Sequence, residues 1–272
     1  MLRSMYSGVS GMRGFQTKLD VIGNNIANVN TIGFKSGRVM FKDIMSQTVS
    51  GVTAPGEDGQ GGVNAKQVGL GVSIASIDTL HLAGSAQTTN NPTDLRIDGD
   101  GFFLVKLTED QETAFLTRAG DFHIDAARNL VTADGLHVLD SDGGLIQLGD
   151  DVTAFSISND GTIVQTMADG TTEAGVKIGV AKVTNPSGLE KIGGNLYRMT
   201  LNANAEGELV PTTANNTEDG TGAIISGQLE MSNVDLTNEF TEMIVSQRGF
   251  QANSRIITTS DEVLQEVVNL KR

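Results

Sequence analysis

The chain has 272 residues and a formal net charge of −14, from 19 Lys and Arg residues against 33 Asp and Glu residues. A chain this acidic repels polyanions, so we expect no nucleic-acid partner. It contains no cysteine, which excludes disulfides, thiolate metal sites and cysteine nucleophiles. Aromatic residues make up only 4% of the chain, so few bulky side chains are available to line an ordinary enzyme pocket.

The first residues lack the apolar run and the small-residue cleavage site of a secretory signal peptide, so we expect no cleaved signal. No apolar stretch approaches the length of a membrane-spanning helix, and we therefore expect no insertion into a membrane.

Apolar side chains recur every three or four residues through the first thirty positions, which predicts a helix. The series is Leu2, Met5, Val9, Met12, Phe15, Leu19, Ile22, Ile26 and Val29. Gly8, Gly11, Gly14 and Gly23 lie within it, and each costs an isolated helix about 1 kcal/mol relative to Ala. We therefore expect this helix to become ordered only when other chains pack against it.

The same helix ends in an asparagine-rich run with Asn24, Asn25, Asn28 and Asn30. Asparagine is unfavourable inside a helix, so the run needs an explanation. One interpretation is helix termination, with Gly33 as the stop signal. The other is that the amides form hydrogen bonds within and between subunits of a tightly packed assembly. Both interpretations remain open at this point.

A second helix is expected after Asp235, which is a suitable N-cap residue. Its heptad frame runs through Phe240, Met243, Gln247, Phe250, Ser254, Ile257, Asp261, Leu264 and Val268. A self-sufficient coiled coil would not place Gln247, Ser254 and Asp261 on its seam. We therefore expect the apolar positions of this frame to pack on several neighbouring helices.

Between the two ends the sequence changes to short alternating runs separated by Asp-Gly and similar turns, which are typical of antiparallel strands. The predicted fold class is α+β, with long terminal helices paired as a coiled-coil-like inner domain and a mainly antiparallel β domain inserted between them. The expected ranges are 1–32 for the first helix, 33–75 for an extended linker, 76–225 for the β domain and 226–272 for the second helix. Residues 50–64 and 203–222 read as loops.

Few residues suggest a metal or catalytic site. Asp98 and Asp100, like Asp140 and Asp142, resemble the start of a calcium loop, but hairpin turns explain both pairs better. His81, His123 and His137 lack metal-ligand spacing and are expected on β surfaces. Nucleotide-binding and hydrolase motifs are missing from the sequence, so we expect no cofactor, no metal and no enzymatic activity.

Three stretches of sequence resemble one family. Residues 19–35 (LDVIGNNIANVNTIGFK) resemble the N-terminal signature of the bacterial flagellar rod and hook proteins. Residues 232–236 (SNVDL), 247–254 (QRGFQANS) and 261–264 (DEVL) are similar to its C-terminal signature. Residues 94–103 (DLRIDGDGFF) and 117–122 (TRAGDF) resemble its β domain.

The resemblance implies that subunits stack into a hollow helical tube, with paired terminal helices inside and β domains outside. It also implies export through the flagellar type III channel, a location in the flagellar hook or basal body, and identical subunits as partners. Neighbouring rod, hook cap and hook–filament junction proteins are further expected partners. The C-terminal residues are most similar to those of hook proteins, so we expect a hook subunit that transmits torque. The chain length also suits the alternative, a distal rod subunit.

Subunit packing is expected to involve the apolar seams and the asparagines. These residues are Leu19, Ile22, Asn24, Asn25, Ile26, Asn28, Val29, Phe240, Met243, Phe250, Ile257, Leu264 and Val268. A competing hypothesis, from a different functional class, is that the chain is a secreted adhesin or a calcium-stabilised binding module.

Overall fold

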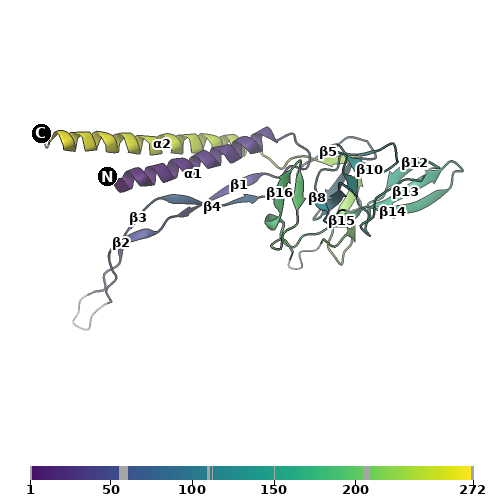
Figure 1. The fold of residues 1–272 in the computed structure, drawn as a ribbon, viewed down its shortest axis with the longest axis horizontal. Helices are drawn as coiled ribbons and strands as arrows, with labels where there is room; N and C mark the ends of the chain where they lie inside the picture. The colour runs from purple at the N-terminus through teal and green to yellow at the C-terminus, as the bar shows by residue number, and fades with distance from the viewer. Residues whose placement is uncertain are drawn as a thin grey trace. The chain divides into compact units, whose positions relative to one another are not determined.

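The computed structural model describes residues 2–54, 61–108, 111, 113–149, 151–204 and 209–270, and it divides into two compact units. The first unit contains Met1–Ala27, Gly37–Thr79 and Asp235–Arg272. The second contains Asn28–Ser36 and Leu80–Val234. A helix stands at each end of the chain and strands make up most of the middle, so the α+β class is confirmed (Figure 1).

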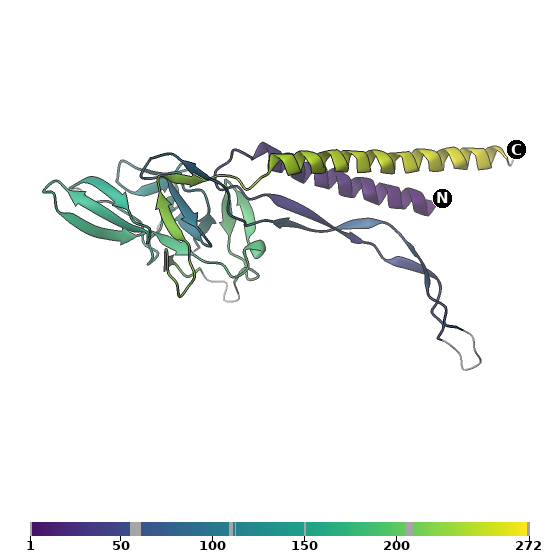
Figure 2. The ribbon, with the colours of Figure 1, turned by 180° about the vertical axis from the view of Figure 1, so that it is seen from behind.

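The helices of the first unit are α1 (Leu2–Ala27) and α2 (Leu236–Asn269). Asp235 caps α2 as expected, because its Oδ1 atom accepts a hydrogen bond from the backbone N–H of Thr237 at 2.9 Å. The two helices lie side by side in both views (Figures 1 and 2). No described helix carries an apolar stretch long enough to cross a membrane.

The first unit also contains two antiparallel strand pairs. They are β1 (Gly37–Asp43) with β4 (Val72–Thr79), and β2 (Ser46–Ser50) with β3 (Lys66–Gly69). Much of the range expected as an extended linker, 33–75, therefore forms paired strands. Within the expected loop 50–64, Thr53 and Val63 form an isolated bridge, and residues 55–60 lie outside the described residues.

The second unit is built on a nine-stranded sheet with the order β16-β17-β8-β7-β11-β10-β9, in which β15 pairs with β7 and β18. The strands are β7 (Phe102–Lys106), β8 (Phe115–Thr117), β9 (Phe122–Ile124), β10 (Leu130–Thr132), β11 (His137–Val138), β15 (Gly179–Ala181), β16 (Glu190–Gly193), β17 (Leu196–Arg198) and β18 (Thr212–Thr213). The pairings between these strands are antiparallel, which agrees with the alternating pattern of the sequence.

Both faces of this sheet are buried at β7. Phe103 and Val105 belong to one apolar cluster, whereas Phe102 and Leu104 belong to a second one. Successive side chains of a strand point to opposite faces, so β7 contributes alternate residues to the two clusters. This explains why β7 is apolar throughout instead of alternating with polar residues.

Smaller sheets complete the second unit. Strands β12 (Val152–Ile157), β13 (Thr162–Met167) and β14 (Thr172–Lys177) form a three-stranded meander. Strand β19 (Ala223–Ser226) pairs with β6 (Leu95–Asp98), and β20 (Gln228–Glu230) pairs with β5 (Ala86–Thr88). The start of the range expected as the second helix, 226–272, is therefore strand, and α2 begins at Leu236. Part of the expected loop 203–222, residues 205–208, lies outside the described residues.

Candidate functional site

Glycines on α1 let the two helices approach each other closely. A Cβ atom at Gly11 would lie 2.8 Å from Nδ2 of Asn253, and one at Gly8 would lie 3.4 Å from Cγ1 of Ile257. Both glycines are buried. Two of the four glycines that weaken α1 as an isolated helix, Gly8 and Gly11, therefore contribute to the surface on which α2 packs.

Two phenylalanine rings of the same unit pack directly against glycines, in the space that a Cβ atom would need. A Cβ atom at Gly249 of α2 would lie 2.6 Å from the ring of Phe15, and one at Gly14 would lie 2.8 Å from the ring of Phe41 in β1. The centroids of the two rings are 5.9 Å apart. Phe15 thus packs against both α2 and β1.

The polar residues of α2 that face α1 differ from those of the expected heptad frame. Ser246 is buried, and Asn253 and Ser260 are partly buried, whereas Gln247, Ser254 and Asp261 are exposed. The hydroxyls of Ser260 and Ser4 are 3.4 Å apart. The polar residues of the less exposed face of α2 thus each lie one position before those of the expected frame, whereas Ile257 of that frame does face α1.

Asn25 joins α1 to two other elements of the first unit. Its amide accepts a hydrogen bond from the Gly37 N–H at 3.0 Å and donates one to the Gly37 carbonyl at 2.9 Å. The amide also donates to Oε1 of Glu239 in α2 at 3.0 Å. Burial raises the pKa of Glu239, and the hydrogen bond from Asn25 opposes this shift. One asparagine of the run therefore forms hydrogen bonds within the subunit.

The same run also ends the helix. The last residue of α1 is Ala27, and Gly33 adopts a left-handed φ of +68°. A Cβ atom at Gly33 would lie 2.5 Å from the backbone nitrogen of Ala119, so only glycine fits at this position. Termination and hydrogen bonding within the chain thus occur together.

The other residues expected to pack between subunits differ in exposure. Ile22 is buried, and Leu19, Ile26, Asn28, Val29, Met243, Ile257 and Leu264 are partly buried. Asn24, Phe240, Phe250 and Val268 are exposed. Further exposed apolar residues of α2 and its C-cap, which were not among the predicted packing residues, are Leu236, Ile244, Val245, Ile256, Val263, Val267 and Leu270. We call these residues, together with Phe240, Phe250 and Val268, the α2 apolar surface.

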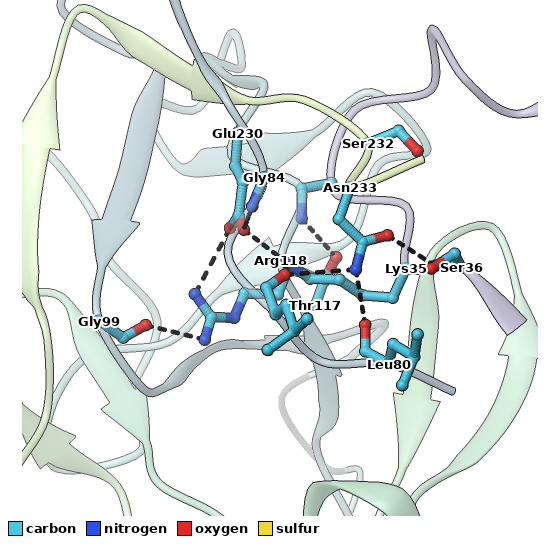
Figure 3. Close-up of polar contacts among 12 residues, drawn as sticks. Lys35, Ser36, Leu80, Gly84, Gly99, Thr117, Arg118, Glu230, Ser232 and Asn233 are labelled. Atoms are coloured by element: carbon cyan, nitrogen blue, oxygen red, sulfur yellow. Dashed lines mark hydrogen bonds and ion pairs between the residues drawn. The ribbon is translucent and has the colours of Figure 1, made fainter. Parts of the chain in front are cut away.

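A buried ionic cluster in the second unit was not anticipated (Figure 3). Nζ of Lys35 lies 2.5 Å from Oε1 of Glu230, and Nη1 of Arg118 lies 3.4 Å from Oε2 of the same residue. Burial lowers the pKa of both Lys35 and Arg118, and the charge of Glu230 opposes the shift in each case. Glu230 is thus the carboxylate that two buried cations share, and removal of one partner of a buried pair is strongly destabilising.

Hydrogen bonds tie this cluster to the surrounding backbone (Figure 3). Lys35 donates to the carbonyl of Leu82 at 2.7 Å, and the backbone N–H of Gly84 donates to Oε1 of Glu230 at 3.0 Å. Arg118 donates to the carbonyl of Gly99 at 2.9 Å. The cluster therefore joins the segments Asn28–Ser36 and Leu80–Val234 within the second unit. Lys35 and Arg118 both occur in the family-like stretches, which was the only signal for them in the sequence.

The histidines and acidic pairs show no metal-binding geometry. His81 lies outside any strand and contacts the rings of Phe102 and Tyr197, whereas His123 and His137 lie on β9 and β11. Oδ1 of Asp140 accepts backbone hydrogen bonds within its own turn. Among the described residues, no group of three or more His, Asp or Glu side chains could hold a metal ion.

Comparisons with known proteins match the same stretches of the chain. A model of flagella basal body rod proteins matches residues 5–35, and a model of the flagellar hook protein FlgE/F/G D1 domain matches residues 96–165. A model of the flagellar basal body rod FlgEFG protein C-terminal region matches residues 225–270. These ranges overlap the three stretches in which the resemblance was found.

Full-length relatives include both rod and hook proteins. The chain is 56% identical over 273 residues to the flagellar basal-body rod protein FlgG of Bacillus subtilis (strain 168), with all of both chains covered. It is 36% identical over 277 residues to the FlgG of Borreliella burgdorferi, again with full coverage. The flagellar hook protein FlgE of that organism is 30% identical over 450 residues, with both chains fully covered.

Proposed function

Because the chain belongs to the family of bacterial flagellar rod and hook proteins, we propose that it is a subunit of the distal rod of the flagellar basal body. The family is structural and not enzymatic, and its members belong to the flagellum. The observation that carries the proposal is the 56% identity to a rod protein along the whole chain, against 30% to a hook protein in an alignment of 450 residues.

This proposal replaces the hook as the favoured function. The expectation of a hook rested on the similarity of residues 247–262 and 267–272 to hook proteins. The family model for this region covers FlgE, FlgF and FlgG together, and relatives with the names FlgG and FlgE are a rod protein and a hook protein. A match to this model therefore does not distinguish rod from hook. The comparison along the whole chain favours the rod instead.

In the proposed assembly, α1 and α2 form the inner wall of a tube by coiled-coil-like packing with identical subunits, and the β-rich second unit lies outside. The α2 apolar surface supports this proposal. Phe240, Phe250 and Val268 are exposed in the single chain, and burial of an apolar side chain of this size contributes about 1.5–3 kcal/mol. Packing between subunits would remove such residues from water.

The proposed partners are identical subunits and the neighbouring rod proteins. The hook cap and hook–filament junction proteins were expected as partners of a hook and are not part of the rod proposal. We propose that the chain leaves the cell by type III export without cleavage. Mass spectrometry of the protein recovered from basal bodies tests this, and a shortened N-terminus would contradict it.

Immunogold electron microscopy of isolated hook–basal bodies tests the rod assignment. An epitope inserted into the exposed turn between Met167 and Thr172 labels the second unit without entering either helix. We expect gold on the straight rod inside the basal body. Gold along the curved hook would overturn the rod assignment and favour the hook.

A further inference from the structure

A groove with a volume of about 470 Å³ runs along α1 within the first unit. Its apolar lining includes Tyr6 and Val9 from α1 and Leu70, Val72 and Ile74 from β4 and the residues before it. Tyr6 is 72% exposed, so the groove has a solvent-accessible aromatic wall. The backbone N–H of Val72 donates to Oγ of Ser10 at 3.3 Å, which connects the two walls.

Arg13 supplies the charge of this groove. Among the described lining residues it is the only charged one, and its side chain is exposed. It forms no ion pair with another described residue within 4.0 Å. A ligand that fits this groove therefore combines apolar side chains with a carboxylate.

The last turns of α2 have this chemistry. Val263, Val267 and Leu270 are exposed and follow the i, i+4, i+7 spacing of one helix face. Glu262 and Glu266 precede the two valines and are also exposed. Residues 261–270 contain three acidic residues and no basic one, while Lys271 and Arg272 lie outside the described residues.

These turns cannot fill the groove of their own chain. Gly11 faces Asn253, Gly8 faces Ile257 and Ser4 faces Ser260, so the helices are antiparallel and residues after 260 lie beyond this end of the contact. The groove begins at Tyr6 and extends to Thr17 along α1, in the opposite direction. The end of α2 can therefore reach such a groove only on another molecule.

We propose that the end of α2, residues 261–270, docks into the α1 groove of a second copy of this chain. Val263 and Val267 enter the apolar part of the groove, and Glu262 or Glu266 pairs with Arg13 at its rim. Charge complementarity selects this occupant over a neutral apolar segment. The inference rests on the proposed function, because it specifies one contact between subunits of the rod.

Charge reversal in the full-length chain tests the contact in a host that lacks its own copy of the protein. The variants are Arg13→Glu, Glu262→Arg, Glu266→Arg and each combination with Arg13→Glu. Arg3→Glu is the matched control, because Arg3 is an exposed residue of α1 that does not line the groove. The readout is the number of epitope-labelled rods in electron micrographs.

Arg13→Glu is expected to lower the number of labelled rods roughly tenfold, because attraction becomes repulsion at every copy of the contact. Arg3→Glu is expected to assemble like the parent chain. One of the acidic reversals should restore assembly when combined with Arg13→Glu. Circular dichroism of the purified monomer shows whether Arg13→Glu folds. If it does not, Arg13→Gln replaces it, and only the loss of assembly is then scored, because a neutral residue offers no charge to exchange.

Normal assembly of a folded Arg13 variant would overturn the docking inference. So would a loss of assembly that neither Glu262→Arg nor Glu266→Arg repairs. Failure of the proposed function has a different signature, because the parent chain itself would then label the curved hook. The same charge exchange would in that case be scored on hooks.

Discussion

Nζ of Lys35 donates a 2.5 Å hydrogen bond to Oε1 of Glu230, and the two side chains are 0% and 1% exposed. The two residues are 195 positions apart in the chain. Lys35 lies two residues before the start of β1, and Glu230 lies six residues before the start of α2. One ion pair therefore holds together two segments of the second unit that are far apart in the chain.

Removal of the charge of Glu230 is expected to destabilise the chain strongly. Glu230→Gln removes the buried carboxylate that pairs with both Lys35 and Arg118, and breaking such a pair costs about 3–5 kcal/mol. Urea unfolding of the purified full-length chain, followed by circular dichroism, measures the change in the free energy of unfolding.

The matched control for this variant is Glu190→Gln. Oε2 of Glu190 and Nη2 of Arg198 are also 2.5 Å apart, but the two side chains are 53% and 55% exposed. An exposed pair contributes at most about 1 kcal/mol, because water screens it. A similar decrease in the free energy of unfolding in Glu230→Gln and Glu190→Gln would contradict the importance of the buried cluster.

Two glycine substitutions are expected to act in opposite directions. Gly249→Ala places a Cβ atom 2.6 Å from the Phe15 ring and should separate α1 from α2. Gly23→Ala meets no atom within 4 Å and should stabilise α1 by about 0.5–1 kcal/mol, because Ala has the higher helix propensity. The helical circular dichroism signal during urea titration measures both effects. If both variants unfolded at a higher urea concentration than the parent chain, close packing at Gly249 would be unimportant.

Asn25→Ala is expected to weaken the first unit. It removes both partners of the Gly37 backbone groups and the donor to Glu239, and an unsatisfied buried group costs about 1–3 kcal/mol. Asn30→Ala is the control, since Asn30 is exposed and surface changes usually stay within about 0.5 kcal/mol. Equal effects on the helical signal in urea would refute the role of Asn25.

Acid is expected to destabilise the second unit through His81. Burial, together with the charges of Lys35, Arg118 and Lys191, lowers the pKa of His81 from 6.5 to about 4. Between these values the unfolded chain binds a proton that the folded chain does not, so the free energy of unfolding falls as the pH falls. Unfolding of the parent chain and of His81→Leu from pH 7 to pH 4 tests this. The fall should be smaller in His81→Leu, and identical slopes would exclude His81 as its source.

The terminal helices are expected to need neighbouring subunits for full order. In α2 only Ser246 is buried among the described residues, whereas β7 is almost completely buried. Hydrogen exchange on dilute monomer should therefore be faster at amides of α1 and α2 than at those of β7. Assembled rods provide the comparison, in which the helices should gain protection. Equal protection of α2 and β7 in the monomer would contradict this expectation.

Local patterns in the sequence were sufficient to predict the secondary structure in outline. The spacing of Leu19 and Ile22 indicated the first helix, Asp235 marked the start of the second, and alternating runs indicated antiparallel strands. These signals are local, because caps, turns and periodicity depend on residues close together in the chain. The motifs around Lys35 and Arg118 indicated the family for the same reason.

The sequence by itself determined the α+β class, the family and the positions of the two helices. Only the tertiary structure decided that Asn253 and Ser260 face α1 and that Ser246 is buried, because the choice between adjacent polar residues depends on how closely two distant helices approach. It also decided that Lys35, Arg118 and Glu230 share one buried cluster. No local pattern encodes contacts between residues that far apart, since they form only when the complete sheet brings its segments together.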